Sequence, residues 1–154
     1  MSELFKKFDE IKKRYPASAE ASATMPLFDY IQSQKGFIEE SDIDLVVNYL
    51  KVPRIIVEEN LSWYDMLYTK PKGQFVVKVC RNVSCSLMGA EHIIKYLEKK
   101  LGIKEGETSN DKKFTLKTVE CLASCGTAPM MMINSTYYEN LNETKIDEIL
   151  AGLK

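Results

Sequence analysis

The chain has 154 residues, of which 45% are hydrophobic and 28% charged, and its formal net charge is −1. This is the composition of an ordinary globular protein that is long enough to bury a core. The balanced charge provides no basic stripe for a nucleic acid, and no apolar run is long enough to span a bilayer. The acid-rich start "MSELFKKFDEIKKRYP" is unlike a secretory or organellar leader, so we expect an intracellular protein.

Residues 1–70 are predicted to form a small all-helical region, because apolar side chains recur at helical spacing in four successive segments. Gly36 is expected to end the second helix. Ser41 is expected to cap the third helix, with Asp44 at the capping-box position. Pro53 suits the first turn of the fourth helix, "RIIVEENLSWYDML". The segment "WYDMLY" is expected to anchor the core of this region, and contact of part of it with a partner is the alternative.

The turn-rich segment "TKPKG" (69–73) marks the expected boundary, and an α/β region follows at 74–154. The short apolar run "QFVVKVC" predicts a buried strand, and "SLMGAEHIIKYLEKKLG" predicts a helix. Gly89 inside that helix either weakens it or permits a close approach to the preceding loop. "FTLKTVEC" and "PMMMIN" predict two more strands, and "TYYENL" a short fourth strand or a turn. Asn142 is the expected cap of a final helix, so the region contains a small mixed sheet.

The four cysteines of the chain form two pairs, each at the end of a predicted strand. Four residues separate Cys80 from Cys85, thirty-five follow, and three separate Cys121 from Cys125. If the two strands are neighbours, both pairs lie at one edge of the sheet. Structural disulfides are rare inside cells, so a metal site or redox chemistry is favoured.

Several kinds of site are compatible with these pairs. Four thiolates with this spacing suit a structural zinc ion or a [2Fe–2S] cluster. The alternative is that the cysteines are buried core residues that bind no metal. A thioredoxin-type dithiol needs two residues between its cysteines, which neither pair has, and a peroxide-sensing thiol would have to be exposed with a low pKa. His92 is expected to be a solvated helix residue. No glycine-rich dinucleotide or phosphate-binding motif is present, so the chain itself is not expected to bind NAD or flavin.

The segments "C-RNVS-C-SLMG" and "T-VE-C-LAS-C-GTAP" closely resemble the small [2Fe–2S] subunit of NADH:quinone oxidoreductase, respiratory complex I. Equivalent subunits occur in NAD-linked hydrogenases and formate dehydrogenases. The connecting segment "LGIKEGETSNDKKFTLKTVECL", the closing "YYENLNETKIDEIL" and the helical "GFIEESDIDLVVNYLKVPRIIVEE" are also similar. The resemblance therefore covers nearly the whole chain.

This resemblance implies a thioredoxin-like [2Fe–2S] ferredoxin domain at 74–154, preceded by a helical region at 1–70 that docks a partner. It implies that Cys80, Cys85, Cys121 and Cys125 ligate one [2Fe–2S] cluster. The chain would then be an electron-transfer subunit without a substrate site of its own, with FMN and NAD on a flavin- and NADH-binding partner. Its expected location is the cytoplasmic face of the membrane, without a membrane span of its own. The alternatives are a diaphorase subunit of a soluble hydrogenase or formate dehydrogenase, and a zinc-stabilised adaptor without a redox role.

Two departures from the family pattern bear on these expectations. Ala123 stands where the family usually carries glycine, so a positive φ there would strain the backbone. Trp63 and Leu67 replace aromatic residues of the family's FYxMF-like motif, which concerns the surface that meets the partner. Pro129 is compatible with either a cis or a trans peptide bond.

Overall fold

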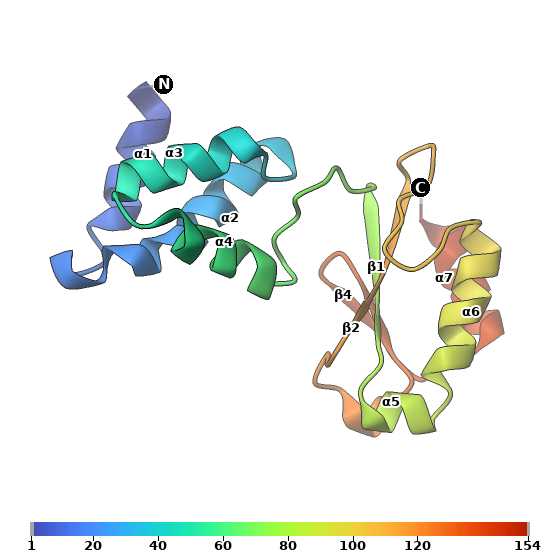
Figure 1. The fold of residues 1–154 in the computed structure, drawn as a ribbon. Helices are drawn as coiled ribbons and strands as arrows, with labels where there is room; N and C mark the ends of the chain where they lie inside the picture. The colour runs from blue at the N-terminus through green and yellow to red at the C-terminus, as the bar shows by residue number, and fades with distance from the viewer. Residues whose placement is uncertain (1, 154) are drawn as a thin grey trace. The chain divides into compact units, whose positions relative to one another are not determined.

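The computed structural model describes residues 2–153 and divides the chain into two compact units, with the boundary between Pro71 and Lys72 (Figure 1). Each unit has its own hydrophobic core. Within the described part of the chain, no helix is both long and apolar enough to cross a lipid bilayer.

The first unit is entirely helical, as predicted. Its elements are α1 (Ser2–Lys12), the 3-10 helix η1 (Ala17–Ala23), α2 (Thr24–Lys35), α3 (Glu40–Leu50) and α4 (Arg54–Trp63). The 3-10 helix η1 was not expected from the sequence. One buried residue from each of the four α-helices shows how they share a core: Phe8, Leu27, Val46 and Val57 are all fully buried. The ring of Phe8 also packs edge-on against Tyr49, with 5.1 Å between the ring centroids.

The helix ends in this unit follow local chemistry. Gly36 ends α2 with a φ of 89°, a left-handed conformation that glycine adopts without steric cost, as expected. The predicted start of α3 was wrong, because Glu39 rather than Ser41 is the N-cap. The carboxylate of Asp42 accepts a hydrogen bond from the Glu39 N–H at 2.7 Å, so the capping box begins two residues earlier than predicted.

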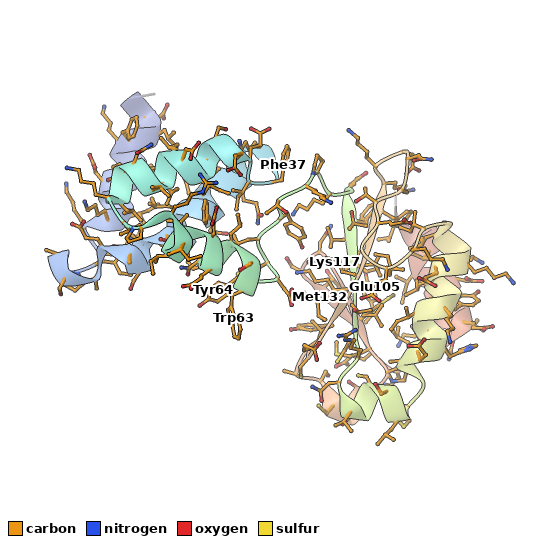
Figure 2. The ribbon with its side chains drawn as sticks, viewed as in Figure 1. Phe37, Trp63, Tyr64, Glu105, Lys117 and Met132 are labelled. Atoms are coloured by element: carbon orange, nitrogen blue, oxygen red, sulfur yellow. The ribbon has the colours of Figure 1, made fainter. Side chains whose placement is uncertain are left out.

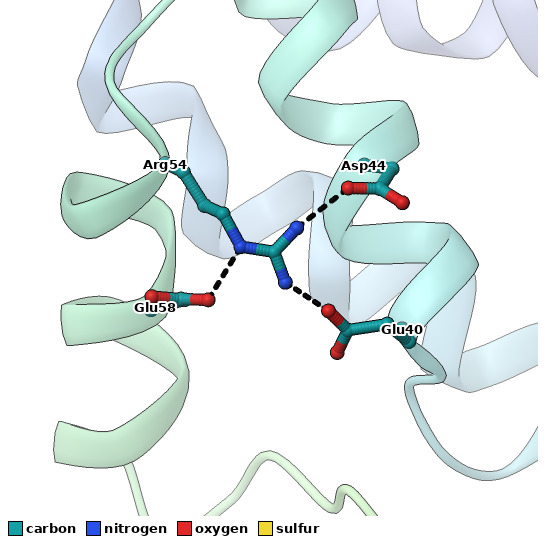
Figure 3. Close-up of polar contacts among 4 residues, drawn as sticks. All are labelled: Glu40, Asp44, Arg54 and Glu58. Carbon is teal, nitrogen blue, oxygen red and sulfur yellow. Dashed lines mark hydrogen bonds and ion pairs between the residues drawn. The ribbon is translucent and has the colours of Figure 1, made fainter.

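Asp44, which the sequence analysis assigned to that capping box, instead pairs with Arg54 on the neighbouring helix (Figure 3). The Arg54 guanidinium donates to Asp44 at 2.6 Å, to Glu58 at 2.6 Å and to Glu40. These ion pairs link α3 to α4 at a partly exposed position. Such surface pairs stabilise a fold only modestly, so the buried side chains hold this unit together.

The second unit contains a four-stranded mixed sheet in the order β2-β1-β3-β4. Its strands are β1 (Phe75–Cys80), β2 (Phe114–Val119), β3 (Met131–Ile133) and β4 (Thr136–Tyr138). β1 pairs with β2 in parallel and with β3 antiparallel, and β3 pairs antiparallel with β4. The predicted α/β arrangement with a small mixed sheet is confirmed, and "TYYENL" contributes a short fourth strand.

Helices α6 (Ala90–Leu101) and α7 (Glu143–Gly152) pack against the sheet (Figure 1). Alternate strand residues face them, because successive side chains on a strand point to opposite faces. The core residues contributed by both layers include Val77, Val79, Leu116, Ile93, Leu97 and Ile146. Asn142 caps α7 as predicted, with its side-chain oxygen accepting from the Lys145 N–H at 2.8 Å.

The single helix predicted after β1 is in fact two helices. Gly89 lies between them, so it neither weakens a helix from inside nor permits a close approach. The short α5 (Val83–Leu87) ends before Gly89, which has a φ of 94° and precedes α6. A Cβ at this position would meet nothing within 4 Å, so close packing is not the reason for glycine. The left-handed turn between the two helices requires it.

Candidate functional site

The register of β1 and β2 brings the two cysteine segments together. Cys80, the last residue of β1, lies opposite Val119, the last residue of its parallel neighbour. The chain beyond β2 reaches Cys121 two residues later, slightly past the predicted strand end. The Arg81 N–H donates to the Val119 carbonyl at 3.0 Å, and the Arg81 guanidinium pairs with Glu120 at 3.0 Å. Both pairs therefore begin at the same edge of the sheet, as the sequence analysis expected.

The first pair is buried. Cys80 is 3% exposed and Cys85, on α5, is 2% exposed. Both pack in a small cluster with Ala128 and Met130, on the segment that leads into β3. Burial, followed by a hydrogen bond with Cys80, raises the pKa of the Cys85 thiol to about 11. A positive charge nearby, such as a metal ion, would have to offset this effect for Cys85 to act as a thiolate.

The second pair lies on the exposed loop after β2, within which Cys125 begins the short 3-10 helix η2 (Cys125–Thr127). Cys121 and Cys125 are exposed, and Ala123 between them has a φ of 59°. In this conformation the Ala123 N–H points at Cys121 and donates to its sulfur at 3.3 Å. Ala123 thus occupies the left-handed region, which glycine would occupy without strain. Leu122 packs against the cluster around Cys80 and Cys85, which ties this loop to the first pair.

Two hydroxyl groups and a carboxylate form hydrogen bonds at the loop that carries Cys121 and Cys125, and this contact was not predicted from the sequence. Glu139, just after β4, accepts hydrogen bonds from the hydroxyls of Ser124 and Thr127. A serine before Cys125 and a threonine two residues after it were the only sequence signal for this contact. Pro129 follows the loop with a cis peptide bond, one of the two possibilities left open by the sequence.

The four cysteines supply the donor set of a [2Fe–2S] cluster, and a structural zinc ion takes the same four thiolates. All four cysteines are free thiols, and electrostatic effects on Cys85 come from both Cys80 and Cys125. In a [2Fe–2S] cluster four thiolates share two irons, so each iron needs only one pair of cysteines. His92 is exposed and pairs with Glu143 at 2.9 Å, consistent with its expected role as a solvated helix residue.

Exposed apolar side chains border the cysteine site. On α5 and just after it, Val83 is 67% exposed, Leu87 82% and Met88 61%. Large apolar groups that gather on a surface in this way often mark a contact with another molecule. The neighbouring Cys85 points inward, so α5 has one buried face that carries a thiol and one exposed apolar face.

A second exposed apolar group lies in the helical unit, at the end of α4. Leu67 of "WYDMLY" is buried in the core of this unit, whereas Trp63 is 82% exposed and does not anchor it. Figure 2 shows Trp63 and Tyr64 projecting from the C-terminal end of α4. They line a surface hollow of about 460 Å³ together with residues of the last turns of this helix.

Comparisons with known proteins agree with this geometry. The family described as thioredoxin-like [2Fe–2S] ferredoxin matches residues 8–154. The E-type subunit of NADH-quinone oxidoreductase from Rickettsia typhi is 41% identical over 143 residues, which are 92% of this chain and 84% of that protein. An E-type subunit of NADH-quinone oxidoreductase from Rhizobium meliloti is 38% identical over 141 residues, 92% of this chain and 83% of that protein.

A solved structure shares the fold over most of the chain. The crystal structure of an NAD⁺-reducing [NiFe]-hydrogenase in the air-oxidized state matches with a TM-score of 0.68 and 14% identity over 82% of this chain. This chain spans only 22% of the hydrogenase chain, so the match concerns one part of a larger protein.

Proposed function

Because this chain belongs to the thioredoxin-like [2Fe–2S] ferredoxin family, we propose that it is the electron-transfer subunit of an NADH:quinone oxidoreductase and holds one [2Fe–2S] cluster through Cys80, Cys85, Cys121 and Cys125. One observation carries the assignment of ligands. The parallel pairing of Cys80 with Val119 starts both cysteine segments at the same sheet edge. When bound, the cluster supplies one-electron chemistry, because it accepts and returns a single electron.

In this proposal the chain binds the cluster, keeps water from one side of it and donates a hydrogen bond to a cysteine sulfur. Buried Cys80 and Cys85 shield one side of the site from solvent, together with Met130. The exposed Cys121 receives the Ala123 N–H, and donors of this kind stabilise negative charge on sulfur. These roles are those of electron transfer, and we assign the chain no substrate site of its own.

We assign FMN and NAD to a partner, a flavin- and NADH-binding subunit of the same complex. The exposed side chains of Val83, Leu87 and Met88 support a partner contact beside Cys85, because an electron donor must come close to the cluster. Trp63 supports a second contact, through the helical region at 1–70, while the domain at 74–154 carries the cluster. Attachment to this partner would hold the chain at the cytoplasmic face of the membrane.

The cluster assignment is tested on anaerobically purified protein, by its visible spectrum and by iron and sulfide assays on the same sample. We expect a red-brown protein with about two irons and two sulfides per chain. Cys121→Ser should lose most of the visible absorbance and iron, since each iron needs its pair of thiolates. A colourless wild-type protein that contains zinc would contradict the proposal and favour the adaptor.

The host complex is tested by identifying the proteins that co-purify with the tagged chain. Subunits of a quinone-reducing NADH dehydrogenase are expected. Recovery of a hydrogenase or a formate dehydrogenase instead would assign the chain to one of those complexes. The fold shared with the NAD⁺-reducing hydrogenase makes the hydrogenase the second candidate.

A further inference from the structure

A carboxylate just after β4 holds the loop that carries Cys121 and Cys125. Glu139 accepts a hydrogen bond from the Thr127 hydroxyl at 2.8 Å and another from the Ser124 hydroxyl. Ser124 and Thr127 flank Cys125, so one carboxylate binds the loop on both sides of that cysteine. Both hydroxyls hold the pKa of Glu139 below its ordinary value of 4.5, so this carboxylate is ionised at neutral pH.

The segment that carries Glu139 is itself fixed. The Asn140 N–H donates to the Thr127 carbonyl at 2.8 Å, so backbone and side chain bind the loop together. The Lys145 ammonium donates to the Glu139 carbonyl at 2.6 Å, and Asn142 caps α7. The anchor of the loop is thus continuous with the first turn of a core helix. A carboxylate on such a base is itself held in position and can in turn hold the loop.

We propose that Glu139 is a positioning residue for the cluster: it holds the 121–127 loop in the shape that presents its two cysteines, and its negative charge lowers the reduction potential. This inference rests on the proposed function, because it requires the cluster to be bound by these cysteines. Reduction adds an electron to a site that already carries four thiolates, so a nearby fixed negative charge disfavours the reduced state. The Lys145 ammonium lies close enough to offset part of this charge.

The test separates the hydrogen bonds of Glu139 from its charge. Glu139→Ala removes both, whereas Glu139→Gln keeps an oxygen that can accept from the two hydroxyls and removes only the charge. Glu148→Gln, at an exposed position on α7, is the matched control for the loss of one negative charge. Each purified, cluster-loaded variant is measured twice. The bleaching of visible absorbance in air gives the rate of cluster loss, and a dye-mediated titration gives the midpoint potential.

We expect Glu139→Ala to lose its cluster several times faster than the wild type, and Glu139→Gln to lose it at close to the wild-type rate. At a fixed solution potential, Glu139→Gln should raise the ratio of reduced to oxidised cluster about threefold relative to Glu148→Gln. For one electron this is a shift of about 28 mV, at 59 mV per tenfold change. The direction of the shift follows from the sign of the charge that is removed.

Three results would overturn the inference: an Ala variant that bleaches at the wild-type rate, a Gln variant that bleaches as fast as the Ala variant, or a Gln variant with the midpoint potential of Glu148→Gln. If Glu139→Ala does not fold, the midpoint potential of Glu139→Gln, compared with that of Glu148→Gln, tests the inference by itself. A wild-type chain that binds no cluster would refute the proposed function itself, which is a distinct outcome.

Discussion

Ala123 holds a backbone conformation that an L-residue adopts at a cost. Its φ of 59° lies in the left-handed region, which costs a non-glycine residue roughly 1–2 kcal/mol. Glycine would remove this strain but would add about 0.5–1 kcal/mol of chain entropy to be lost on folding. We therefore expect Ala123→Gly to raise the free energy of unfolding by about 0.5 kcal/mol, measured by urea denaturation of the apo protein. An equal or lower stability would show that the loop relieves the strain in another way.

Gly89 also has a positive φ, so replacing it with alanine is the reverse of the change at Ala123. Its φ is 94° and an added Cβ would meet nothing within 4 Å, so only the backbone conformation opposes a side chain. Gly89→Ala should lower the free energy of unfolding by about 0.5 kcal/mol in the same urea experiment, because the smaller chain entropy of alanine offsets part of the strain. Opposite signs at Ala123 and Gly89 would establish that backbone strain governs both sites.

At the scale of elements, α6 and α7 are joined through Asp147. Its carboxylate accepts from the Lys100 ammonium at 2.9 Å and from the Tyr96 hydroxyl at 2.8 Å. The Lys100 ammonium and then the Tyr96 hydroxyl lower the pKa of Asp147 below its ordinary value of 3.8. A group whose pKa is lowered by folding contributes stability above its unfolded pKa, and this contribution is lost as the pH falls through the folded pKa.

Asp147→Asn should therefore lower the thermal unfolding midpoint at pH 7, and the gap to the wild type should narrow as the pH falls below 3.8. Because these groups lie at the surface, we expect a small shift at pH 7. The measurement is a series of melting curves across acidic pH, with Glu148→Gln on the same helix as the control. A gap that stays constant with pH would mean that shape, rather than charge, gives Asp147 its effect.

Element type was easier to predict from the sequence than element ends. Apolar periodicity identified the α-helices and the strands, because burial of one face depends on that period. The start of α3 was predicted at Ser41 because serine is a good cap, but the Glu39 backbone found its acceptor in Asp42. Gly89 was interpreted as an interior helix residue, although its left-handed conformation separates α5 from α6.

The site could be predicted only in part, for a related reason. Strand register follows from local pattern and chain order, so the meeting of Cys80 with the end of β2 was foreseeable. The contact of Glu139 with Ser124 and Thr127 depends on where β4 returns the chain, which no short-range pattern encodes. Likewise, helical spacing placed Trp63 in a predicted helix without revealing that its ring lies at the surface.

For the whole molecule, the exposed apolar side chains indicate which surfaces a partner would cover. Each unit buries its own core, yet large apolar side chains stay exposed at α5 and at the end of α4. A side chain such as Leu87, 82% exposed, contributes little to the fold of the isolated chain. Its burial would stabilise a complex by about 1.5–3 kcal/mol if a partner covered it fully.

Leu87→Ser should consequently leave the thermal midpoint of the isolated chain unchanged and weaken binding to the flavin-binding partner that we propose. Loss of about 1.5–3 kcal/mol corresponds to roughly a tenfold to hundredfold higher dissociation constant, measured by titration of the purified partner against the cluster-loaded chain. Tyr137→Ser is the matched control, because Tyr137 is 54% exposed on β4, outside the α5 surface. Equal affinity of the Leu87 variant and the wild type would mean that the partner approaches the cluster from another side. Equal weakening by both substitutions would mean that the contact extends over the sheet edge, and that α5 has no special place in it.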